Sequence, residues 1–358
     1  MCLSMQKITL IPGEGIGPEV IEAAVDCVEA SGTKTSWETQ EIRNGFLSPE
    51  VIASIKKNRV ALKGPIATPI GKGFRSVNVQ LREQLGLFAG VRPAKLFQGV
   101  KSPFKGADIV VIRENTEDLY AGIEFRKGSI EQKKLLGFLG KSLSISIASD
   151  SGISLKPISA KASRRITEFA FDYAKQNNRK KITVGHKANI LKYSDGLFLE
   201  TARKVAAKRK STMFEDILLD HLCMQLVKKP QEFDVIVLPN LYGDIVSELC
   251  SGLVGGVGMV PGANIGRKYA VFETVHGTAP KYAGKNKANP CSAILSAALM
   301  LKHIGKTREG KKIEEAVAQV IKEGKHLTLD LKAKGRAAKT TEMTQTIIKK
   351  IEKMWDYG

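Results

Sequence analysis

The stretch FDVIVLPNLYGDIVSE, residues 233–248, decides both the fold and the chemistry that we predict for this chain. Residues 235–238 are apolar and have the composition of a buried strand, and the polar residues after them begin a helix. Asp244 and Glu248 are four residues apart and would share one helical face. Like charges at this spacing repel unless a cation offsets them, so the pair indicates a hard divalent metal with oxygen ligands. A solvated acidic face is the alternative, but apolar and glycine-rich sequence surrounds the pair.

An apolar run followed by polar residues recurs along the chain. The apolar runs are residues 8–11, 60–62, 109–112, 182–184, 235–238 and 270–272, and helical patterns lie between them at 18–30, 166–175 and 290–304. This alternation predicts an α/β protein with a central sheet flanked by helices. Polar residues such as Arg113, Lys187 and His276 follow the runs in the same relative place. Because ligands of such sheets bind beyond the carboxyl ends of strands, we expect one composite site.

Length and composition limit the class of protein. A chain of 358 residues is long enough for two domains, or for one large domain with a subdomain. It has no apolar run of transmembrane length, and the first strand is expected at 7–11, which leaves no room for a signal or transit peptide. We therefore expect a cytoplasmic protein that does not contact a membrane. The cysteines lack metal-ligand or redox spacing and are expected to be reduced and mostly buried: Cys2, Cys27, Cys223, Cys250 and Cys291.

The formal net charge of +20 raises the question of nucleic-acid binding. Basic clusters such as residues 204–210 have no interleaved aromatic side chains and no recognised binding motif, so a solvated helical face is the better interpretation. We predict no nucleic-acid partner. The charge does favour the attraction of small polyanions.

Residues 119 to about 160 break the α/β pattern, because they are rich in Lys, Ser and Gly. Within them, SLSISIA at residues 142–148 alternates as an exposed or intermolecular strand would. We predict that this segment is an inserted arm.

The motif GEGIGP, residues 13–18, follows a strand and opens a helix. A dinucleotide-binding fingerprint would need its third glycine at position 18, where Pro18 stands instead. Since proline is well placed in the first turn of a helix, we interpret the motif as a tight strand-to-helix turn. A turn beside a cofactor remains open, given other support.

Three arginines flank a candidate anion pocket. A glycine-bearing loop that starts at Thr68 runs into Ser76, Asn78 and Arg82, and Arg92 and Arg113 lie near the next strand ends. The planar fork of arginine binds carboxylates through two hydrogen bonds, so a substrate with two or three carboxylates would need such a set. Each arginine alone is more often a surface ion-pair partner, but their shared placement at loop starts and strand ends favours a site.

Two further groups have the chemistry of a site. Tyr120 and Lys187 are candidate proton-transfer groups, since a desolvated lysine can have its pKa lowered toward neutral pH. Residues 276–284 and the asparagines that follow, Asn286 and Asn289, have the small residues and turn formers of a loop that lets a ligand approach the backbone.

Together these motifs resemble the β-decarboxylating dehydrogenases, the family of isocitrate, isopropylmalate and homoisocitrate dehydrogenases. The resemblance extends over nearly the whole chain, from the turn at residues 13–19 to the loop at 276–284. Ser76 and Asn78 resemble the isocitrate branch, in which these side chains contact the distal carboxylate of the substrate. The isopropylmalate branch would be expected to have apolar side chains there.

The resemblance implies a role for each candidate residue in oxidising and decarboxylating isocitrate. Mg²⁺ or Mn²⁺, held by Asp220, Asp244 and Glu248, would chelate the 2-hydroxyl and the adjacent carboxylate. Lys187 would help remove the hydroxyl proton and Tyr120 would protonate the carbon after CO₂ leaves. The implied substrate-binding residues are Thr68, Ser76, Asn78, Arg82, Arg92 and Arg113. The implied cofactor-binding residues are Asn189, His276, Gly277, Thr278, Ala279, Lys281, Tyr282 and Asn289.

The resemblance also implies an isopropylmalate-dehydrogenase-like two-domain fold. Residues 1–90 and 255–358 would form a large cofactor-binding domain, and residues 91–118 and 160–254 a small domain for dimerisation, metal and substrate. Residues 119–159 would be a clasp arm. Since Lys187 and Asp220 reach across from a second subunit in this family, a homodimer with shared active sites is expected.

Two positions separate the alternatives within the family. Glu248 stands where the family usually has Asp, so direct metal ligation by Glu248 is not expected. Lys281 and Tyr282 resemble the pair that meets the 2′-phosphate of NADP, so we predict NADP, with an NAD-dependent isocitrate or homoisocitrate dehydrogenase as the alternative. A non-catalytic regulatory subunit would be expected to have lost Tyr120, Lys187 or an aspartate, and all are present.

Overall fold

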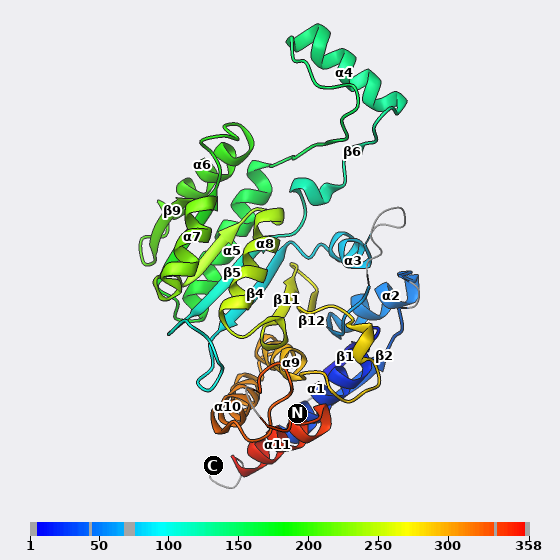
Figure 1. Ribbon diagram of the computed structural model, residues 1–358, viewed down its shortest axis with the longest axis vertical. Helices are drawn as coiled ribbons and strands as arrows, with labels where there is room; N and C mark the ends of the chain where they lie inside the picture. The colour runs from blue at the N-terminus through cyan, green and yellow to red at the C-terminus, as the bar shows by residue number, and fades with distance from the viewer. Residues whose placement is uncertain (1–5, 43–44, 68–75, 333–334, 355–358) are drawn as a thin grey trace.

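A ten-stranded sheet runs through the whole protein (Figure 1). The structure is a computed structural model that describes residues 6–42, 45–67, 76–332 and 335–354. The strands lie in the order β2-β1-β3-β12-β11-β4-β5-β10-β8-β9. Their bounds are β1 Gln6–Ile11, β2 Thr35–Thr39, β3 Val60–Lys63, β4 Ala89–Lys95, β5 Asp108–Glu114, β8 Lys181–His186, β9 Met213–Leu218, β10 Val235–Leu238, β11 Pro261–Ile265 and β12 Ala270–Thr274.

The helices flank this sheet, and four short 3₁₀ turns interrupt the loops. The helices are α1 Gly17–Ala30, α2 Pro49–Asn58, α3 Val77–Leu85, α4 Ile130–Leu143, α5 Ala160–Gln176, α6 Ser194–Ala206, α7 Leu219–Lys228, α8 Asn240–Leu253, α9 Cys291–His303, α10 Thr307–Glu323 and α11 Thr340–Lys353. The 3₁₀ turns are η1 Asp118–Ala121, η2 Pro230–Glu232, η3 Val257–Met259 and η4 Pro280–Tyr282. Every apolar run predicted as a strand is a strand here, which confirms the α/β fold class. Within the described residues, none of the helices has the length and apolarity needed to span a membrane.

The middle of the sheet is antiparallel, although the rest is parallel. Strand β11 runs antiparallel to both β12 and β4, and β4 runs antiparallel to β5. In an antiparallel pair, the carboxyl end of one strand lies beside the amino end of its neighbour. Residues that follow one strand and residues that precede the next therefore meet at the same edge of the sheet. This is where the candidate site lies.

Alternating side chains give the sheet two buried faces. Val110 and Ile112 of β5 pack in a core that includes α5 and α9, whereas Ile109 and Val111 of the same strand pack with α7 and α8. A third core lies between α2, α3 and the strands β1 and β3. Strands of the predicted large domain and of the predicted small domain belong to the same sheet. The division into two domains therefore stays a prediction.

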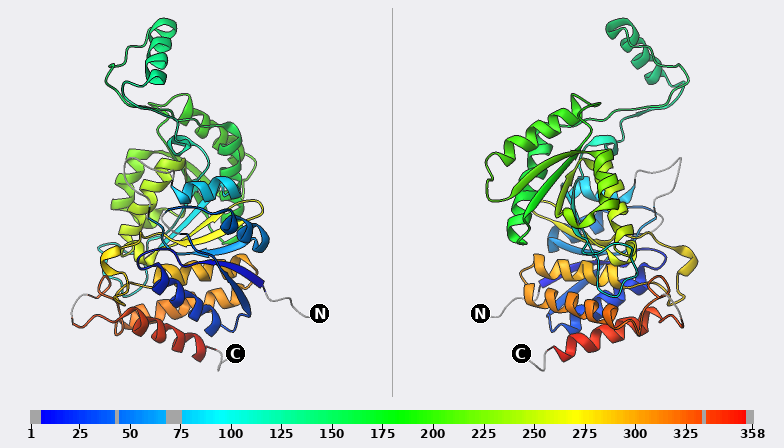
Figure 2. Two further views of the ribbon diagram at one scale, coloured as in Figure 1. Left: turned by 90° about the vertical axis from the view of Figure 1, so that its right-hand side faces the viewer. Right: turned by 60° about the vertical axis from the view of Figure 1, so that its left-hand side comes forward.

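Residues 118–159 form an arm: its base packs on the body, where Asp118 is fully buried, and its outer part, residues 122–155 with α4, projects away, as both further views show (Figure 2). The arm contains η1, a two-stranded ribbon of β6 (Glu124–Phe125) and β7 (Ile153–Ser154), and the helix α4. The strand expected at residues 142–148 is wrong for the single chain, because 142–143 end α4 and 144–148 lie outside any helix or strand. Helix α4 is capped at its start, where the Ser129 hydroxyl accepts a hydrogen bond from the amide of Gln132 at 3.1 Å. Residues 144–148 do not form a strand because no strand of the described chain pairs with them. The intermolecular alternative stays a prediction.

The turn before α1 is the tight strand-to-helix turn that the sequence predicts. Gly13 and Gly15 adopt the left-handed conformation, with φ of +80° and +64°. A Cβ at Gly15 would lie 2.0 Å from the carbonyl oxygen of Thr278, so only glycine fits. The amide of Ile16 donates to the same carbonyl at 2.9 Å. The turn therefore packs directly against the loop predicted to bind the cofactor.

Candidate active site

The start of α8 places Asp244 against two side chains from other elements. Arg113, at the end of β5, forms an ion pair with one Asp244 carboxylate oxygen, and the Tyr120 hydroxyl donates to the other. The Arg113 guanidinium also lies 4.6 Å from the centre of the Tyr120 ring, and its Nε donates to Asn240 Oδ1 at 2.8 Å. We call these four residues the Asp244 cluster. It joins β5, η1 and α8.

The Asp244 cluster is partly open to solvent. The Asp244 side chain is 40% exposed, whereas Arg113 is 4% exposed. Partial burial and the hydrogen bond to Asp244 raise the pKa of Tyr120, so the phenol keeps its proton at neutral pH. The Arg113 Nη2 atom is buried and has no hydrogen-bond partner in the described structure. Since an unpaired buried donor is costly, this atom favours an anionic ligand.

A second group surrounds Glu273 on β12. Its carboxylate lies 2.9 Å from Lys63 Nζ, 3.0 Å from Arg92 Nη2 and 3.9 Å from Arg82 Nη2. Asn264 Nδ2 also donates to it at 2.6 Å. We call these five residues the Glu273 cluster.

All members of the Glu273 cluster are buried. Burial alone would raise the pKa of Glu273, but Lys63, Arg92 and Arg82 hold it well below the usual range. Burial and the neighbouring Arg113 lower the pKa of Arg82 to about 10, so its guanidinium remains charged at neutral pH. The Nε atom of Arg82 has no hydrogen-bond partner in the described structure, and neither has the buried Oδ1 of Asn78. The predicted arginine set is therefore buried, charged and only partly paired.

Lys187 and Asp220 form a separate pair. Lys187 Nζ lies 2.7 Å from Asp220 Oδ1, and this ion pair lowers the pKa of Asp220. Asp220 is 67% exposed. In the described part of the chain, no hydrogen bond or ion pair joins the side chain of Lys187 or Asp220 to Tyr120, Asp244 or Glu248. Within one chain, the Lys187–Asp220 pair is therefore separate from the Asp244 cluster.

The predicted metal ligands fit a divalent cation in chemistry, although one chain does not gather them. Partial burial and the negative charge of Asp244 raise the pKa of Glu248, and a cation between the carboxylates would relieve that repulsion. Among the described residues, no three acidic, histidine or cysteine side chains are close enough to hold a metal. Asp220 would therefore complete the set only from a second chain, as the resemblance implies.

The predicted cofactor residues lie in two places. His276, Gly277, Thr278 and Ala279 follow β12 beside the Gly13–Gly17 turn, and Lys281 and Tyr282 lie exposed on η4. The buried Nε2 of His276 has no partner in the described structure, and burial lowers the pKa of this imidazole.

The other two predicted cofactor residues, Asn289 and Asn189, lie outside the loop at 276–282. The buried Asn289 is bound to Asp330 (2.8 Å) and to the amide of Cys291 (2.9 Å). Asn189 is exposed in the turn after β8. Of the substrate candidates, Ser76 stands at the start of α3, and Thr68 lies outside the described residues.

Sequence reasoning missed Lys63 and did not assign a role to Glu273. Both are charged residues at the ends of apolar strands, β3 and β12, that pair side by side through Lys63 and Glu273. A charged residue at the end of an apolar run was the available signal. It was applied after other strands, at Arg113 and Lys187 for example, but not to Lys63 at the end of β3.

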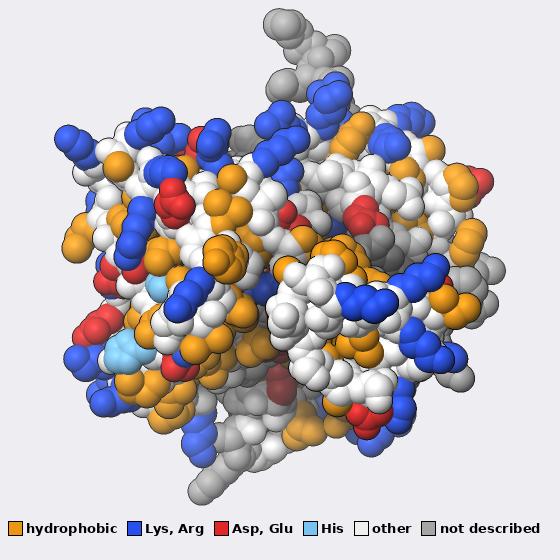
Figure 3. Space-filling view, turned by 90° about the horizontal axis from the view of Figure 1, so that it is seen from above, with side chains coloured by type: hydrophobic (Ala, Val, Ile, Leu, Met, Phe, Trp, Pro, Cys, Tyr) orange, Lys and Arg blue, Asp and Glu red, His pale blue; other side chains and the backbone are white. Residues whose placement is uncertain are grey.

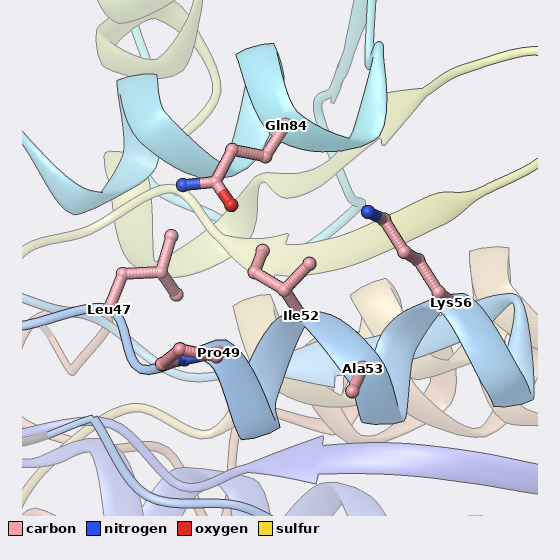
Figure 4. A pocket seen from close by; sticks show the side chains of 6 residues that line it. All are labelled: Leu47, Pro49, Ile52, Ala53, Lys56 and Gln84. Carbon is pink, nitrogen blue, oxygen red and sulfur yellow. The ribbon is translucent and has the colours of Figure 1, made fainter.

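A cavity away from this site does not have the chemistry of an active site. It measures about 360 Å³, lies between α2 and α3, and has only one charged side chain in its lining (Figure 4). The lining residues are Leu47, Pro49, Ile52, Ala53, Lys56 and Gln84. The basic surface is likewise dispersed, because Lys and Arg side chains are spread over the face in Figure 3 with Asp and Glu among them.

The fold and the site define an α/β protein in which arginine, tyrosine and carboxylate side chains meet at the strand ends. The chain belongs to the isocitrate/isopropylmalate dehydrogenase family, whose sequence profile matches residues 7–347. The resemblance predicted from the motifs is therefore confirmed, and so is the family fold. Enzymes of this family use a divalent metal and a nicotinamide cofactor.

Three relatives illustrate the similarity. The chain is 46% identical to a mitochondrial regulatory subunit of isocitrate dehydrogenase (NAD) of Dictyostelium discoideum, over 97% of this chain and 92% of that protein. It is 44% identical to the probable mitochondrial alpha subunit of isocitrate dehydrogenase (NAD) of Drosophila melanogaster, with 97% and 88% covered. Its structure matches isocitrate dehydrogenase from Methylococcus capsulatus with a TM-score of 0.88 and 44% identity, covering 97% of this chain and 100% of that one.

Proposed function

We propose that this chain catalyses the oxidative decarboxylation of isocitrate to 2-oxoglutarate and CO₂. The observation that carries the proposal is the arginine set: Arg82, Arg92 and Arg113 are buried, and Arg82 Nε and Arg113 Nη2 have no hydrogen-bond partner in the described structure. Three guanidinium groups suit a substrate with three carboxylates. The names of the relatives, which are isocitrate dehydrogenases, support the same substrate.

The side chains divide the chemistry between them. Arg113 and its neighbours bind and orient the substrate carboxylates, which lowers the entropic cost of reaching the reactive geometry. Tyr120, with its raised pKa, holds a proton on its hydroxyl and is placed to deliver it. Lys187 would help remove the proton of the 2-hydroxyl once the amine is neutral, which requires that its ion pair with Asp220 is released. Asp244 and Asp220 of a second chain would hold Mg²⁺ or Mn²⁺, with Glu248 close to them but not a direct ligand, and the bound metal would supply Lewis-acid stabilisation of negative charge on oxygen.

A second chain completes the site in this proposal, because Asp220 and Lys187 lie apart from the Asp244 cluster. The outer faces of α7 and α8 support such pairing, since Met224 and Val227 on α7 and Ile245 on α8 are exposed. The predicted partner is an identical chain. A different subunit of the same fold is the alternative, because relatives are named as subunits.

The cofactor proposed is NAD. The sequence predicts NADP from Lys281 and Tyr282, but the relatives at 44–46% identity are named for NAD. Lys281 is exposed on η4 and has no hydrogen bond or ion pair in the part of the chain that the structure describes. An exposed lysine of this kind contributes little binding energy on its own, about 0–1 kcal/mol.

Steady-state assays test the substrate and the cofactor together. Isocitrate, homoisocitrate and isopropylmalate would be compared with NAD⁺ and NADP⁺ in the presence of Mn²⁺. We expect the highest kcat/KM with isocitrate and NAD⁺. A higher value with NADP⁺ would restore the prediction made from Lys281, and turnover of another substrate in place of isocitrate would refute the proposed reaction. The cytoplasmic location expected from the sequence stays a prediction that cell fractionation would decide.

A further inference from the structure

A partly buried lysine at the base of the arm, Lys156, lies where three segments that carry proposed site residues meet. It follows β7 on the returning strand of the arm. Its Nζ atom lies 2.6 Å from Asp195 Oδ1, 4.0 Å from Asp118 Oδ1 and 4.1 Å from the centre of the Tyr242 ring. Asp118 and Asp195 are both fully buried.

Each of the two aspartates holds a segment that carries a proposed site residue. Asp195 Oδ2 accepts a hydrogen bond from the backbone amide of Lys187 at 2.7 Å. Asp118 Oδ2 accepts one from the amide of Leu241 at 2.8 Å, in the first turn of the helix that carries Asp244. Asp118 is also the first residue of η1, which carries Tyr120 two positions later.

Lys156 supplies the positive charge that this arrangement needs. Among the described residues, it is the only cation that forms an ion pair with Asp118 or Asp195. Asp118 Oδ1 is buried without a hydrogen bond, so Lys156 is its nearest compensation. Burial lowers the pKa of Lys156, but Asp195 and Asp118 outweigh that effect and raise it, so the amine stays charged. Asp118 itself has a φ of +71°, which few residues other than glycine adopt, so its backbone must be held by such contacts.

We propose that Lys156 is a positioning residue that aligns Lys187, Tyr120 and Asp244 through the two buried aspartates. The inference rests on the proposed isocitrate reaction. Lys156 also belongs to the arm, so the arm and the site share one anchor. Displacement of the arm would move Tyr120 and Asp244 in one site, and Lys187 in the site that this chain completes for its partner. A lysine that only fixes the arm to the body is the competing account.

Two variants and a control separate these accounts. Lys156→Met keeps the chain length and removes the charge, and Lys156→Arg keeps the charge. Lys161→Met, on the exposed face of α5, is the matched control. We expect Lys156→Met to lower kcat about 10²-fold, because displacements of about 1 Å have effects of that size, while KM for isocitrate changes less. Lys156→Arg should recover at least part of kcat, and Lys161→Met should match the wild type.

A double-mutant cycle tests whether Lys156 acts through Tyr120. If it does, Lys156→Met should cost less in a Tyr120→Phe background than in the wild type, because residues that act as a unit are not additive. Equal cost in both backgrounds, or wild-type kcat in Lys156→Met, would overturn the inference.

Hydrogen–deuterium exchange gives a readout that does not depend on turnover. Lys156→Met should increase exchange at the amides of Leu241 and Lys187, and Lys161→Met should not. An increase confined to the arm, residues 122–155, would establish the competing account. Should the wild type fail to turn over isocitrate, the proposed reaction fails, and the exchange data still decide whether Lys156 positions the three segments. If Lys156→Met does not fold, Tyr242→Leu, which removes the ring and the hydroxyl that contact Lys156, takes its place in both measurements, and Lys156→Arg is the charge-retaining comparison.

Discussion

Glu273 and Asp244 both pair with arginines, but they differ in burial and in how fully their partners are bound. Glu273 is buried, and its charge is offset by Lys63 and Arg92 at hydrogen-bond distance. Asp244 is 40% exposed and binds Arg113, whose Nη2 atom has no partner in the described structure. The Glu273 cluster is buried and holds Lys63 and Arg92 in place before any ligand arrives, and of its members only Arg82 has a donor, Nε, without a partner in the described structure. The Asp244 cluster is open and still has a donor to offer.

We therefore expect the Glu273 cluster to contribute mainly to the free energy of folding and the Asp244 cluster mainly to the free energy of ligand binding and catalysis. Removing one partner from a buried ion pair costs stability, because the remaining charges stay buried without compensation. Removing a group from an open cluster costs little stability but removes whatever that group does for a bound ligand. The predictions below test the contrast in order of decreasing effect.

The largest effect is expected for Asp244→Asn. This change removes the negative charge that faces Arg113 and Tyr120, so kcat/KM for isocitrate should fall at least about 10³-fold, which corresponds to about 4 kcal/mol. The loss of stability should be smaller than for Glu273→Gln, because Asp244 is 40% exposed and its amide replacement can still accept a hydrogen bond from Arg113. Steady-state kinetics and thermal melting check the two halves of this expectation.

Mixing provides the control. If a second chain completes each site, Asp244→Asn and Asp220→Asn chains that are inactive alone should recover activity when unfolded, mixed and refolded together. No recovery, despite mixed oligomers in native mass spectrometry, would contradict the shared site.

The second effect is on stability. Glu273→Gln leaves Lys63 and Arg92 buried with no counter-charge and should destabilise the fold by about 3–5 kcal/mol. The exposed pair Lys229–Glu232 offers a matched control, since Glu232→Gln should change stability by less than about 0.5 kcal/mol. Urea unfolding measures both. Similar losses in the two variants would remove the contrast between buried and exposed pairs.

The same variant has a defined pH dependence. The pKa of Glu273 is lowered in the folded state, so its stabilisation is fully present above the pKa of an unfolded glutamate, about 4.3, and is lost as pH falls toward the folded value. The stability difference between wild type and Glu273→Gln should therefore be constant from pH 8 to about pH 5 and shrink only in stronger acid.

The smallest effect is expected for Glu248→Asp. Glu248 lies at the exposed edge of the open cluster, and its pKa is raised by partial burial and by Asp244. Shortening it by one methylene should change the Mn²⁺ concentration for half-maximal rate by about threefold or less, near 0.6 kcal/mol. A change of a hundredfold would show that Glu248 is a direct ligand.

The fold was largely predictable because buried strands reveal themselves as apolar runs. Residues 235–238 and 270–272 have no polar residue that could suit an exposed strand, and both are strands within the sheet. The helix α4 was not predictable in the same way, since its residues are mostly exposed and the alternation at 142–148 resembled a strand.

The site was predictable only as residue types at strand ends. That Arg113, Tyr120 and Asp244 touch depends on η1 folding back onto α8, and no spacing in the sequence encodes this contact. The Lys63–Glu273 pair joins residues from strands that are distant in sequence, so only the parallel pairing of β3 with β12 brings them together.

That pairing also has a consequence for how the chain folds as it is synthesised. Residues 89–253 contain β4, β5, β8, β9 and β10 as one continuous segment, so their mutual pairing can be complete soon after the ribosome has made them. Strand β3 must wait for β12, because Val60 pairs with Ala270. Until then its apolar edge has no neighbour on that side, which is the arrangement most prone to association with other chains. The slow and vulnerable step of folding is therefore expected in the part of the sheet that is translated first.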